Sequence, residues 1–470
     1  MFLRMALSSE NCGGLADDDA MAGAAMIRMG AIRNIDTLVG HSDRASCSTD
    51  KSVRLYSYSS SSSDSSSSSS SASASPPSYR FSLNTTIPTS HSRTVRNLAF
   101  SPTGATLATA SFDSTVGIWV QVNEAGVDDG ENGGAGGEAE WEPVDPLEGH
   151  ESECKSVAWS ADGRLLASCS RDKSVWVWEA VGPAEFECLA VLMEHSQDVK
   201  CVTWHPTDEV LASASYDDTI RLYAADPYDD EWTCTHTLAA HAGTVWTLSF
   251  SPCGRYLASA GDDLVIKLWE RISNEDESAY EQGELGAAQR EEGGRMGPWS
   301  RGGVRIGPKE RWRWEVVGEI ADAHDRTVYS LDWQTGGVRA RDGGLGRIVT
   351  AGGDGRINVF QLTQPASAKP GTSPSYALLA SIEDAHGVSD VNHVAWCTLS
   401  PAQAAKTLQR LEGGEGEDEE EEGAGESKTG EGKEGVEQED EDEDPRWKGA
   451  RDMFASAGDD GLVKVWMVDP

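Results

Sequence analysis

The chain has 470 residues, with 39 Lys and Arg against 78 Asp and Glu, and its formal net charge is −39. Nucleic-acid binding requires a basic patch or stripe, so this balance argues against a nucleic-acid partner. No segment is apolar and long enough to span a membrane, and the N-terminal residues turn acidic too early for a secretory signal. We therefore expect a cytoplasmic protein without a membrane partner, and the nucleus remains open as a second location.

The sequence carries no motif for a cofactor, a metal or a catalytic nucleophile. Its 9 cysteines are scattered, without a C-x-x-C pair or a Cys/His cluster, which indicates reduced thiols rather than disulfides or a zinc site. A P-loop, a dinucleotide fingerprint, H-E-x-x-H and G-x-S-x-G are all missing. We expect no cofactor, no metal, no small-molecule substrate and no enzymatic activity.

The N-terminal part contains one predicted strand. Residues 1–30 show no periodic pattern, and we expect them to be disordered or the product of a faulty gene model. The segment IRNIDTLV at residues 32–39 is a candidate strand. Because the chain stops just after a strand that has no later partner, we expect residues 32–39 to pair with that last strand and close the fold.

From His41 onward the chain repeats one pattern of four residue types. An Asp has Ser or Thr four residues before it, an aromatic residue six residues after it, and a His further upstream. His and Asp are 22 residues apart in four of the seven copies, which chance alone does not explain. The seven sets are His41, Ser46, Asp50 and Tyr56; His91, Thr109, Asp113 and Trp119; His150, Ser168, Asp172 and Trp178; His195, Ser213, Asp217 and Tyr223; His241, Ser259, Asp263 and Trp269; His324, Thr350, Asp354 and Phe360; and His386, Ser456, Asp460 and Trp466.

Each repeat predicts a small antiparallel sheet. In residues 150–178, KSVAW, LLASCS and SVWVW are predicted strands, separated by the turn sequences SADGR and RDK. A fourth strand is predicted at residues 187–193. One such sheet cannot bury both of its faces, whereas seven packed around an axis can. The sequence therefore predicts an all-β protein with a single seven-bladed propeller over residues 31–470.

The first repeat is shorter than the others. Only 9 residues separate His41 from Asp50, against 22 in the regular copies. About one strand and half of another are missing, so we predict a truncated first blade. Functional divergence and a faulty gene model both remain open as the reason.

Four low-complexity ranges lengthen the spacing between repeats, at about residues 57–78, 121–146, 271–309 and 403–444. The first is rich in serine, and the others are rich in Gly and acidic residues. Residues 412–444 contain 18 acidic and 2 basic residues, so this stretch contributes 16 of the 39 net negative charges. None of these ranges can form a core, and we expect disordered loops.

The recurring His, Ser or Thr, Asp and aromatic residues admit two interpretations. A hydrolase uses such residue types as base and nucleophile, but in a single cleft. Here the set recurs in nearly every repeat, which favours a buried structural hydrogen-bond chain from Trp through Ser and His to Asp. We predict structural tetrads in the six complete sets and no catalytic residue.

Arg171 precedes Asp172 at the tip of a predicted turn and is the one cation at that position among the seven repeats. Residues that open the first strands lie on the same rim, and several are basic. The predicted protein-binding residues are Arg171, Arg96, Lys155, Lys200, Phe112, Tyr216 and Trp246. They would accept a carboxylate and an aromatic side chain of a peptide. The alternative is a set of solvated cations that nearby loop carboxylates neutralise.

The stretches ASFDSTVGIW, EGHESECKSVAWSADGRLLASCSRDKSVWVWE and ECLAVLMEHSQDVKCVTWHP carry the general WD40 pattern. They resemble, more specifically, the WD-repeat subunit of the cytosolic iron–sulfur protein assembly targeting complex. This resemblance implies a WD40 propeller that acts as a scaffold without holding a cluster. With other subunits of the complex, it would dock apo client proteins for iron–sulfur cluster insertion. It also implies a functional surface arginine within SRDKSVW, which is Arg171.

Two other functions stay open on the sequence. A generic WD40 adaptor, such as a ubiquitin-ligase substrate receptor or a chromatin-complex subunit, would share the fold but not the SRDKSVWVW and EHSQDVK stretches. An enzyme on a propeller would need one non-repeating cluster of polar residues near the axis, and the sequence indicates none.

Overall fold

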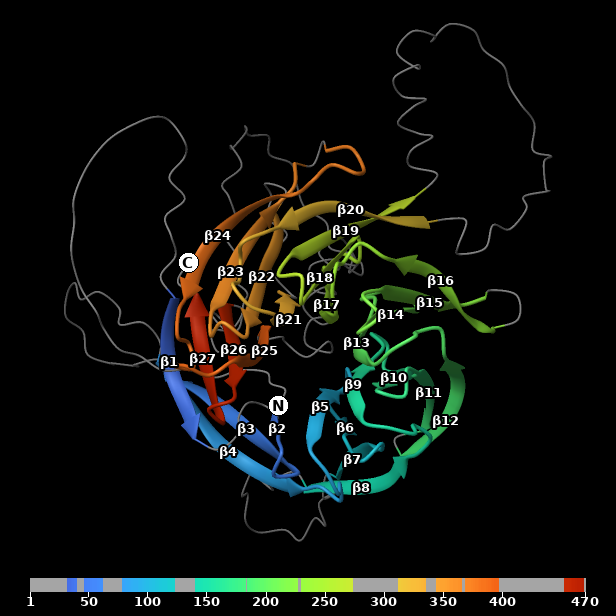
Figure 1. Ribbon diagram of the computed structural model, residues 1–470. Coiled ribbons are helices and arrows are strands. Elements are labelled where there is room, and N and C mark those ends of the chain that lie inside the picture. Colours follow the sequence, from blue (N-terminus) through green and yellow to red (C-terminus); the bar gives the residue numbers. More distant parts are fainter. Residues whose placement is uncertain are drawn as a thin grey trace, which may run out of the picture.

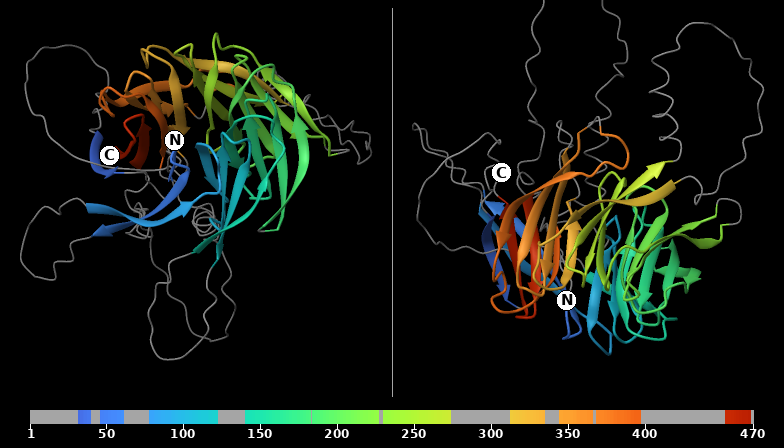
Figure 2. Two further views of the ribbon diagram at one scale, coloured as in Figure 1. Left: turned by 60° about the horizontal axis from the view of Figure 1, so that its bottom comes forward. Right: turned by 45° about the horizontal axis from the view of Figure 1, so that its top comes forward.

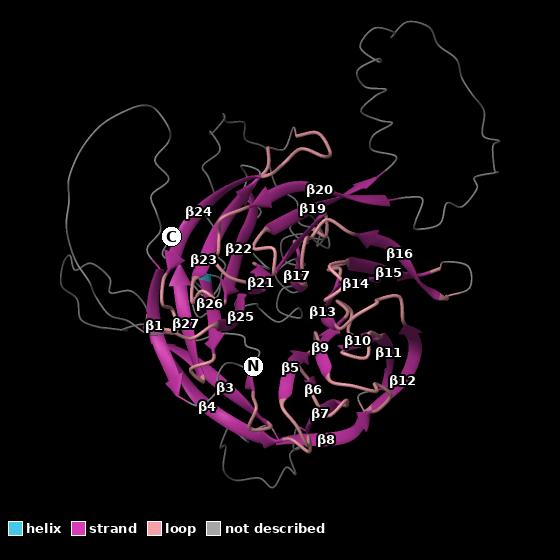
Figure 3. Cartoon of the chain, in the orientation of Figure 1, coloured by secondary structure: helices cyan, strands magenta, loops and turns pink. Residues whose placement is uncertain are grey.

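The computed structural model describes residues 32–39, 46–61, 78–122, 140–182, 184–226, 230–273, 312–334, 344–365, 368–396 and 452–468. They form seven antiparallel sheets that stand around a common axis (Figure 1), and the two views of Figure 2 show the same ring. This arrangement confirms the predicted seven-bladed, all-β propeller. The described residues are strands, turns and loops, with one residue of 3-10 helix at Asp452 and no α-helix (Figure 3). No helix among them could cross a membrane.

The first four blades follow one another along the chain, and each is given from the strand nearest the axis outward. Blade 1 contains β2 (Ser46–Cys47), β3 (Ser52–Ser61) and β4 (Ser78–Pro88). Blade 2 contains β5 (Val95–Phe100), β6 (Thr106–Ser111), β7 (Val116–Val122) and β8 (Glu140–Leu147). Blade 3 contains β9 (Cys154–Trp159), β10 (Leu165–Ser170), β11 (Val175–Gly182) and β12 (Glu185–Leu192). Blade 4 contains β13 (Val199–Trp204), β14 (Val210–Ser215), β15 (Ile220–Ala225) and β16 (Trp232–Leu238).

The last three blades complete the ring. Blade 5 contains β17 (Val245–Phe250), β18 (Tyr256–Gly261), β19 (Ile266–Ser273) and β20 (Trp312–Ile320). Blade 6 contains β21 (Val328–Trp333), β22 (Gly344–Gly352), β23 (Ile357–Thr363) and β24 (Ser375–Ile382). Blade 7 contains β25 (Val391–Trp396), β26 (Met453–Gly458), β27 (Leu462–Val468) and β1 (Ile32–Val39).

Packing between blades explains the residue pattern of the strands. The second strand of blade 3, β10, is buried along its whole length, because neighbouring blades cover both faces of the sheet. Small residues such as Ala167 and Cys169 therefore alternate there with the buried Ser168. One apolar cluster between blades 3 and 4 contains both Val177 of blade 3 and Tyr223 of blade 4. The core is thus a ring of such clusters rather than one centre.

The turn between the second and third strands has the same backbone shape in every blade. The residue after the Asp has a positive φ, which is 76° at Lys173, 65° at Leu264 and 74° at Gly461. Glycine adopts this region without a steric cost, whereas other residues do so only when the surroundings hold them there. Such a constraint exists in blade 3, where Oδ1 of Asp172 accepts the backbone N–H of Ser174 at 2.9 Å.

The two ends of the propeller are joined as the sequence predicted. Strand β1 pairs antiparallel with β27 over its length, from Ile32 opposite Val468 to Val39 opposite Leu462. Blade 7 is thereby completed by a strand from the other end of the chain, beside blade 1 in Figure 1. Pairing covers the otherwise open edge of β27.

Blade 1 is truncated, as predicted. It contains only three described strands, and β2 pairs with β3 through just two residues, Ser46 and Cys47. At several other junctions, a polar side chain of one innermost strand accepts a hydrogen bond from a backbone N–H of the innermost strand in the following blade. These bonds join Asn97 to Val157 at 2.8 Å, Thr247 to Leu331 at 3.1 Å and Ser330 to Val394 at 3.1 Å. Blade 1 has no described innermost strand with which to continue this series between β25 and β5.

The strand directions divide the molecule into two rims. One rim carries the turns between second and third strands and the loops into each first strand, and we call it the Arg171 rim. The remaining turns of each blade lie on the opposite rim. The described ranges are separated by gaps in the chain. Except at residues 40–45, the two strand ends that flank each gap lie on the opposite rim.

The strands reach further into the predicted low-complexity ranges than the composition suggested. β3 continues to Ser61, β8 begins at Glu140 and β19 ends at Ser273. Their partners keep them in register, with Ser61 opposite Ser78 and Ser273 opposite Trp312. Residues 1–30 and 403–444, about which the sequence also made predictions, lie outside the described residues.

The closure of the ring can be tested by truncation. A chain that begins at residue 41 lacks β1 and exposes the edge of β27, so we expect a melting temperature several degrees below that of the full chain. A chain that begins at residue 32 keeps β1 and serves as the matched control. Differential scanning calorimetry of both compares them, and equal melting temperatures would contradict closure by β1.

Removal of residues 412–444 tests whether the acidic stretch matters for folding. The strands on either side remain paired through Trp396 and Phe454. Because the cost of closing a loop grows only with the logarithm of its length, we expect the free energy of unfolding to rise by less than about 1 kcal/mol. Urea unfolding followed by circular dichroism measures this, and loss of folded protein would show that the stretch is needed for folding.

Candidate interaction site

The four residue types of each complete repeat lie side by side within their blade. In blade 3, Nε1 of Trp178 donates to Oγ of Ser168 at 3.0 Å, and that oxygen lies 2.9 Å from Nε2 of His150. Nδ1 of His150 lies 2.9 Å from Oδ2 of Asp172, which also accepts the backbone N–H of Glu151 at 2.9 Å. One chain of hydrogen bonds therefore runs from the sheet interior to the turn on the Arg171 rim.

The same geometry recurs in blades 2 to 7. The distance from the His Nδ1 to the nearest Asp oxygen is 2.7 to 3.1 Å, and that from Nε2 to the hydroxyl oxygen is 2.6 to 2.9 Å. An indole donates to the hydroxyl in blades 2, 3, 5 and 7, while Tyr223 and Phe360 take the aromatic position in blades 4 and 6. In blade 1, Asp50 instead accepts from Ser52 of its own turn at 2.9 Å.

These chains have the chemistry of a scaffold rather than of a nucleophile. Burial would raise the pKa of the Asp172 carboxyl, but hydrogen bonds from His150 and Ser174 outweigh burial and hold the pKa well below its usual value. The Ser168 hydroxyl is fully buried and already engaged by Trp178 and His150, so a substrate cannot reach it. His41, the predicted first member in blade 1, lies outside the described residues.

Arg171 stands at the tip of the turn between β10 and β11. Its backbone N–H donates to the carbonyl oxygen of Glu153 at 3.0 Å, which fixes the turn against the loop into β9. Its side chain is 58% exposed and has two ion pairs, with Oε2 of Glu153 at 3.6 Å and with Oδ2 of Asp198 at 4.0 Å. The guanidinium makes no hydrogen bond to any described residue, so its donors remain available.

The neighbouring lysines are held against aromatic rings. The ammonium group of Lys155 lies 2.8 Å from Oε2 of Glu153 and 4.3 Å from the ring centre of Phe112. This hydrogen bond from Lys155 lowers the pKa of Glu153 to about 2. Lys155 is thus fixed on the rim by a carboxylate and by an aromatic ring.

Lys200 repeats that arrangement one blade further on. Its ammonium group lies 3.4 Å from Oδ2 of Asp198 and about midway between two rings, 5.0 Å from Tyr216 and 4.9 Å from Trp246. Burial lowers the pKa of Lys200. Cation–π contacts of this kind are strongest where the cation is partly removed from water.

The structure brings most of the predicted binding residues together but sets Arg96 apart. Arg96 opens β5, is half-buried as a residue and has its Nη1 atom fully buried. Burial lowers the pKa of its guanidinium to about 10, against the opposing charge of Asp459 and other groups. Arg96 is therefore a partly buried cation rather than one presented on the surface as Arg171 is.

Sequence reasoning missed the carboxylates that organise the rim. Glu153 and Asp198 contact the lysines and Arg171, and Arg93 donates to Oε1 of Glu153 at 2.8 Å. A signal was available, because Glu153 and Asp198 both stand three residues after the His of their repeat. The predicted ligand-binding rings of Phe112, Tyr216 and Trp246 contact lysines of the chain itself, which the sequence did not indicate.

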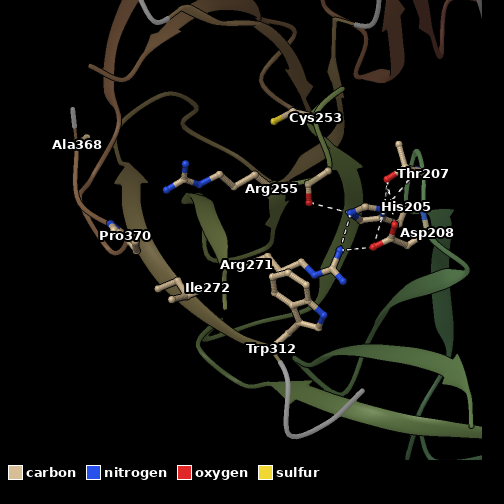
Figure 4. A pocket seen from close by; sticks show the side chains of 11 residues that line it. His205, Thr207, Asp208, Cys253, Arg255, Arg271, Ile272, Trp312, Ala368 and Pro370 are labelled. Atoms are coloured by element: carbon tan, nitrogen blue, oxygen red, sulfur yellow. Dashed lines mark hydrogen bonds and ion pairs between the residues drawn. The ribbon is translucent and has the colours of Figure 1, made fainter. Parts of the chain in front are cut away.

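A pocket of about 390 Å³ opens on the opposite rim (Figure 4). Its wall includes Arg271, whose guanidinium stacks 4.1 Å from the ring centre of Trp312 and is ion-paired with Asp208. Arg255 lines the same pocket and is paired with the buried Glu270. Both guanidinium groups are thus neutralised by the chain itself. No local sequence pattern indicates this pocket, because its lining residues come from several separate segments.

Within the part of the chain that the structure describes, no three His, Cys, Asp or Glu side chains are grouped so as to hold a metal ion. The seven described cysteines are free thiols, and three of them, Cys47, Cys154 and Cys169, are buried. Burial raises the pKa of Cys169 well above its usual value and raises that of Cys201 to about 11. These thiols therefore stay protonated at neutral pH and serve as small apolar packing residues.

Known proteins resemble this chain over nearly its whole length. The family model for the WD40 repeat, described as a WD domain or G-beta repeat, matches residues 82–120, 141–179, 186–224 and 232–270. The probable cytosolic iron-sulfur protein assembly protein 1 of Mycosarcoma maydis is 45% identical over 458 residues, which cover 91% of each chain. The protein of the same name from Cryptococcus neoformans var. neoformans is 38% identical over 90% of this chain and 93% of its own. That from Botryotinia fuckeliana is 32% identical over 90% and 91%.

The hydrogen-bond chains generate a prediction about acid stability. The folded-state pKa of Asp172 is below its unfolded-state value of about 3.9. The ionised carboxylate therefore stabilises the fold above that pH, and this stabilisation is lost as the pH falls through the folded-state pKa. We expect Asp172→Asn to lower the free energy of unfolding by about 1–3 kcal/mol at neutral pH, with a smaller difference below about pH 4.

Urea unfolding of the wild type and of Asp172→Asn at a series of pH values measures this difference. Asp263→Asn should behave in the same way, because its pKa is also lowered by a hydrogen bond from a tetrad His, His241. A difference of constant size across the pH series, or none at neutral pH, would contradict a stabilising role for the ionised carboxylate.

Proposed function

Because the chain belongs to the cytosolic iron-sulfur protein assembly protein 1 family of WD40 proteins, we propose that it is a non-enzymatic scaffold of iron–sulfur protein assembly. Its task would be to dock apo client proteins so that a cluster can be inserted into them. The cluster is then cargo of the machinery, and the propeller supplies a rigid surface. Other subunits of a targeting complex would be its partners. The proposed location is the cytoplasm, with the nucleus as the alternative.

The observation that supports this proposal most directly is the exposed Arg171 guanidinium, whose ion pairs are long. Its guanidinium is more than half exposed, is held by a fixed turn, and makes no hydrogen bond within the described residues. A planar guanidinium with free donors suits a bidentate pair with a carboxylate. Lys155 and Lys200 lie nearby with side chains that are only 16% and 11% exposed, so Arg171 is the cation that this surface presents. An acidic segment of a client or partner is the ligand that such a cation fits best.

The aromatic rings contribute in a way that differs from the simplest expectation. Phe112, Tyr216 and Trp246 contact the lysine ammonium groups and so set where these charges lie. An aromatic side chain of the ligand would therefore pack at the edges of these rings, beside the lysines. Interfaces are commonly dominated by such central clusters of aromatic residues and arginine.

A generic WD40 adaptor is the second candidate function. It would have the same fold and could use the same rim, but it would bind ubiquitin-ligase or chromatin subunits. The whole-length similarity to proteins named for iron–sulfur protein assembly favours the first candidate. The identity of the captured proteins separates the two.

Charge reversal at Arg171 tests the proposed site. We expect Arg171→Glu to leave the melting temperature almost unchanged, since an exposed cation with long ion pairs contributes little to folding. The variant should nevertheless recover much less of its partners from cell extract in a pull-down quantified by mass spectrometry. Iron–sulfur proteins and assembly subunits are the expected set, whereas ubiquitin-ligase or chromatin subunits would support the second candidate.

Arg326→Glu provides the matched control. Arg326 lies on the same rim in blade 6, is similarly exposed at 61%, and is paired with Asp390 at 3.0 Å. We expect this variant to capture partners as the wild type does. Equal capture by Arg171→Glu and the wild type would remove Arg171 from the proposed site and leave it an ordinary solvated cation.

A further inference from the structure

We infer that Glu153 and Asp198 are positioning residues, which hold the Arg171 guanidinium ready for an incoming carboxylate. This inference rests on the proposed function of the Arg171 rim and deepens it. Neither acidic residue would touch the ligand's carboxylate. Both would act through Arg171, by limiting the orientations that its long side chain can adopt before the ligand arrives.

The geometry around Arg171 has one carboxylate on each side. Glu153 approaches Nη1 at 3.6 Å and Asp198 approaches Nε at 4.0 Å. Glu153 belongs to the loop into blade 3 and Asp198 to the loop into blade 4, so the guanidinium is held across the junction of two blades. Both distances are too long for hydrogen bonds, and the N–H donors of Arg171 therefore remain free for a ligand.

The two carboxylates are themselves fixed in place. The side chain of Glu153 is only 14% exposed and is bonded to Lys155 at 2.8 Å and to Arg93 at 2.8 Å. Asp198 is tied by its ion pair with Lys200, and its backbone oxygen accepts the N–H of Tyr216 at 2.9 Å. Since the lysines lie against aromatic rings, the carboxylates form part of a rigid frame, and Arg171 is its least restrained member.

A positioning role and a purely electrostatic role predict opposite results. Around Arg171, the negative charges of Glu153 and Asp198 lie close to the positive charges of Arg93, Lys155 and Lys200. If charge alone decided affinity, removal of either acidic residue would favour an acidic ligand. If the residues position Arg171, their removal weakens binding even though the rim becomes more positive, because the ligand must then order a freer side chain.

The test is a double-mutant cycle with a defined probe, a fluorescein-labelled peptide of three Glu-Phe repeats. We expect Glu153→Gln and Asp198→Asn each to raise the Kd of this peptide about fivefold by fluorescence anisotropy. In an Arg171→Ala background the same two substitutions should leave the Kd unchanged or lower it, since no guanidinium remains to be positioned. Asp198→Glu, which restores the charge, should bind more nearly like the wild type.

Two controls make the outcome specific. Asp390→Asn removes a carboxylate from the same rim next to Arg326, and it should not raise the Kd. A peptide of three Gln-Phe repeats should bind weakly to the wild type and should not distinguish the variants. Melting temperatures establish that each variant is folded, and the conservative Asp198→Glu variant allows the comparison to be made if Asp198→Asn is unstable.

The outcomes distinguish failure of the positioning role from failure of the proposed carboxylate site. Tighter binding by Glu153→Gln and Asp198→Asn, by the same factor with and without Arg171, would overturn the positioning role and leave the docking site standing. Failure of the wild type to bind the Glu-Phe peptide, or equal binding by wild type and Arg171→Ala, would instead overturn the proposed carboxylate site and with it this inference.

Discussion

The hydrogen bond between a His ring and a turn Asp is the interaction on which both the fold and the site depend. In each of blades 2 to 7 it joins the loop into the blade to the turn between the second and third strands. These two segments make up the Arg171 rim. The interior end of each chain is anchored by a buried hydroxyl, as at Ser168, so the rim is attached to the sheet and not merely placed above it. Residues between the anchors can then vary, and one such variable position holds Arg171.

The junctions on either side of blade 1 differ from those between the four-stranded blades. Innermost strands are linked from blade to blade by side-chain to backbone bonds, such as that from Asn97 to Val157. Blade 1 has no described innermost strand, and Arg96 of the adjoining β5 has its guanidinium partly buried. The ring is held there by the outer strands, since β1 from the start of the chain is paired with β27 of the last blade. A defect near the axis is thus tolerated where closure at the periphery is complete.

The repeat of His, Ser, Asp and Trp was sufficient to predict the fold, because each residue type is required by a buried bond at a fixed spacing. The truncated blade followed from the same spacing, whereas the closing strand followed from the last repeat, whose third strand has no later partner. Pairwise contacts across blades could not be predicted in this way. That Lys200 lies between Tyr216 and Trp246 depends on how three loops from neighbouring blades approach each other. The partial burial of Arg96 depends on the space beside blade 1, and the pocket at Arg271 depends on five separate segments, so neither leaves a local pattern in the sequence.

Nearly all strand ends that flank the intervening ranges lie on the opposite rim, and this bears on how such a protein can change over evolutionary time. Ser61 and Ser78 pair opposite each other although they are not adjacent in the chain, and the cost of closing such a loop grows only slowly with its length. Codons can therefore be gained or lost there without a change in the Arg171 rim, and we expect changes in length to accumulate on one face. The same face is the natural place to graft a fluorescent domain or to attach the molecule to a sensor surface, because the Arg171 rim, the proposed binding face, then points towards the solution.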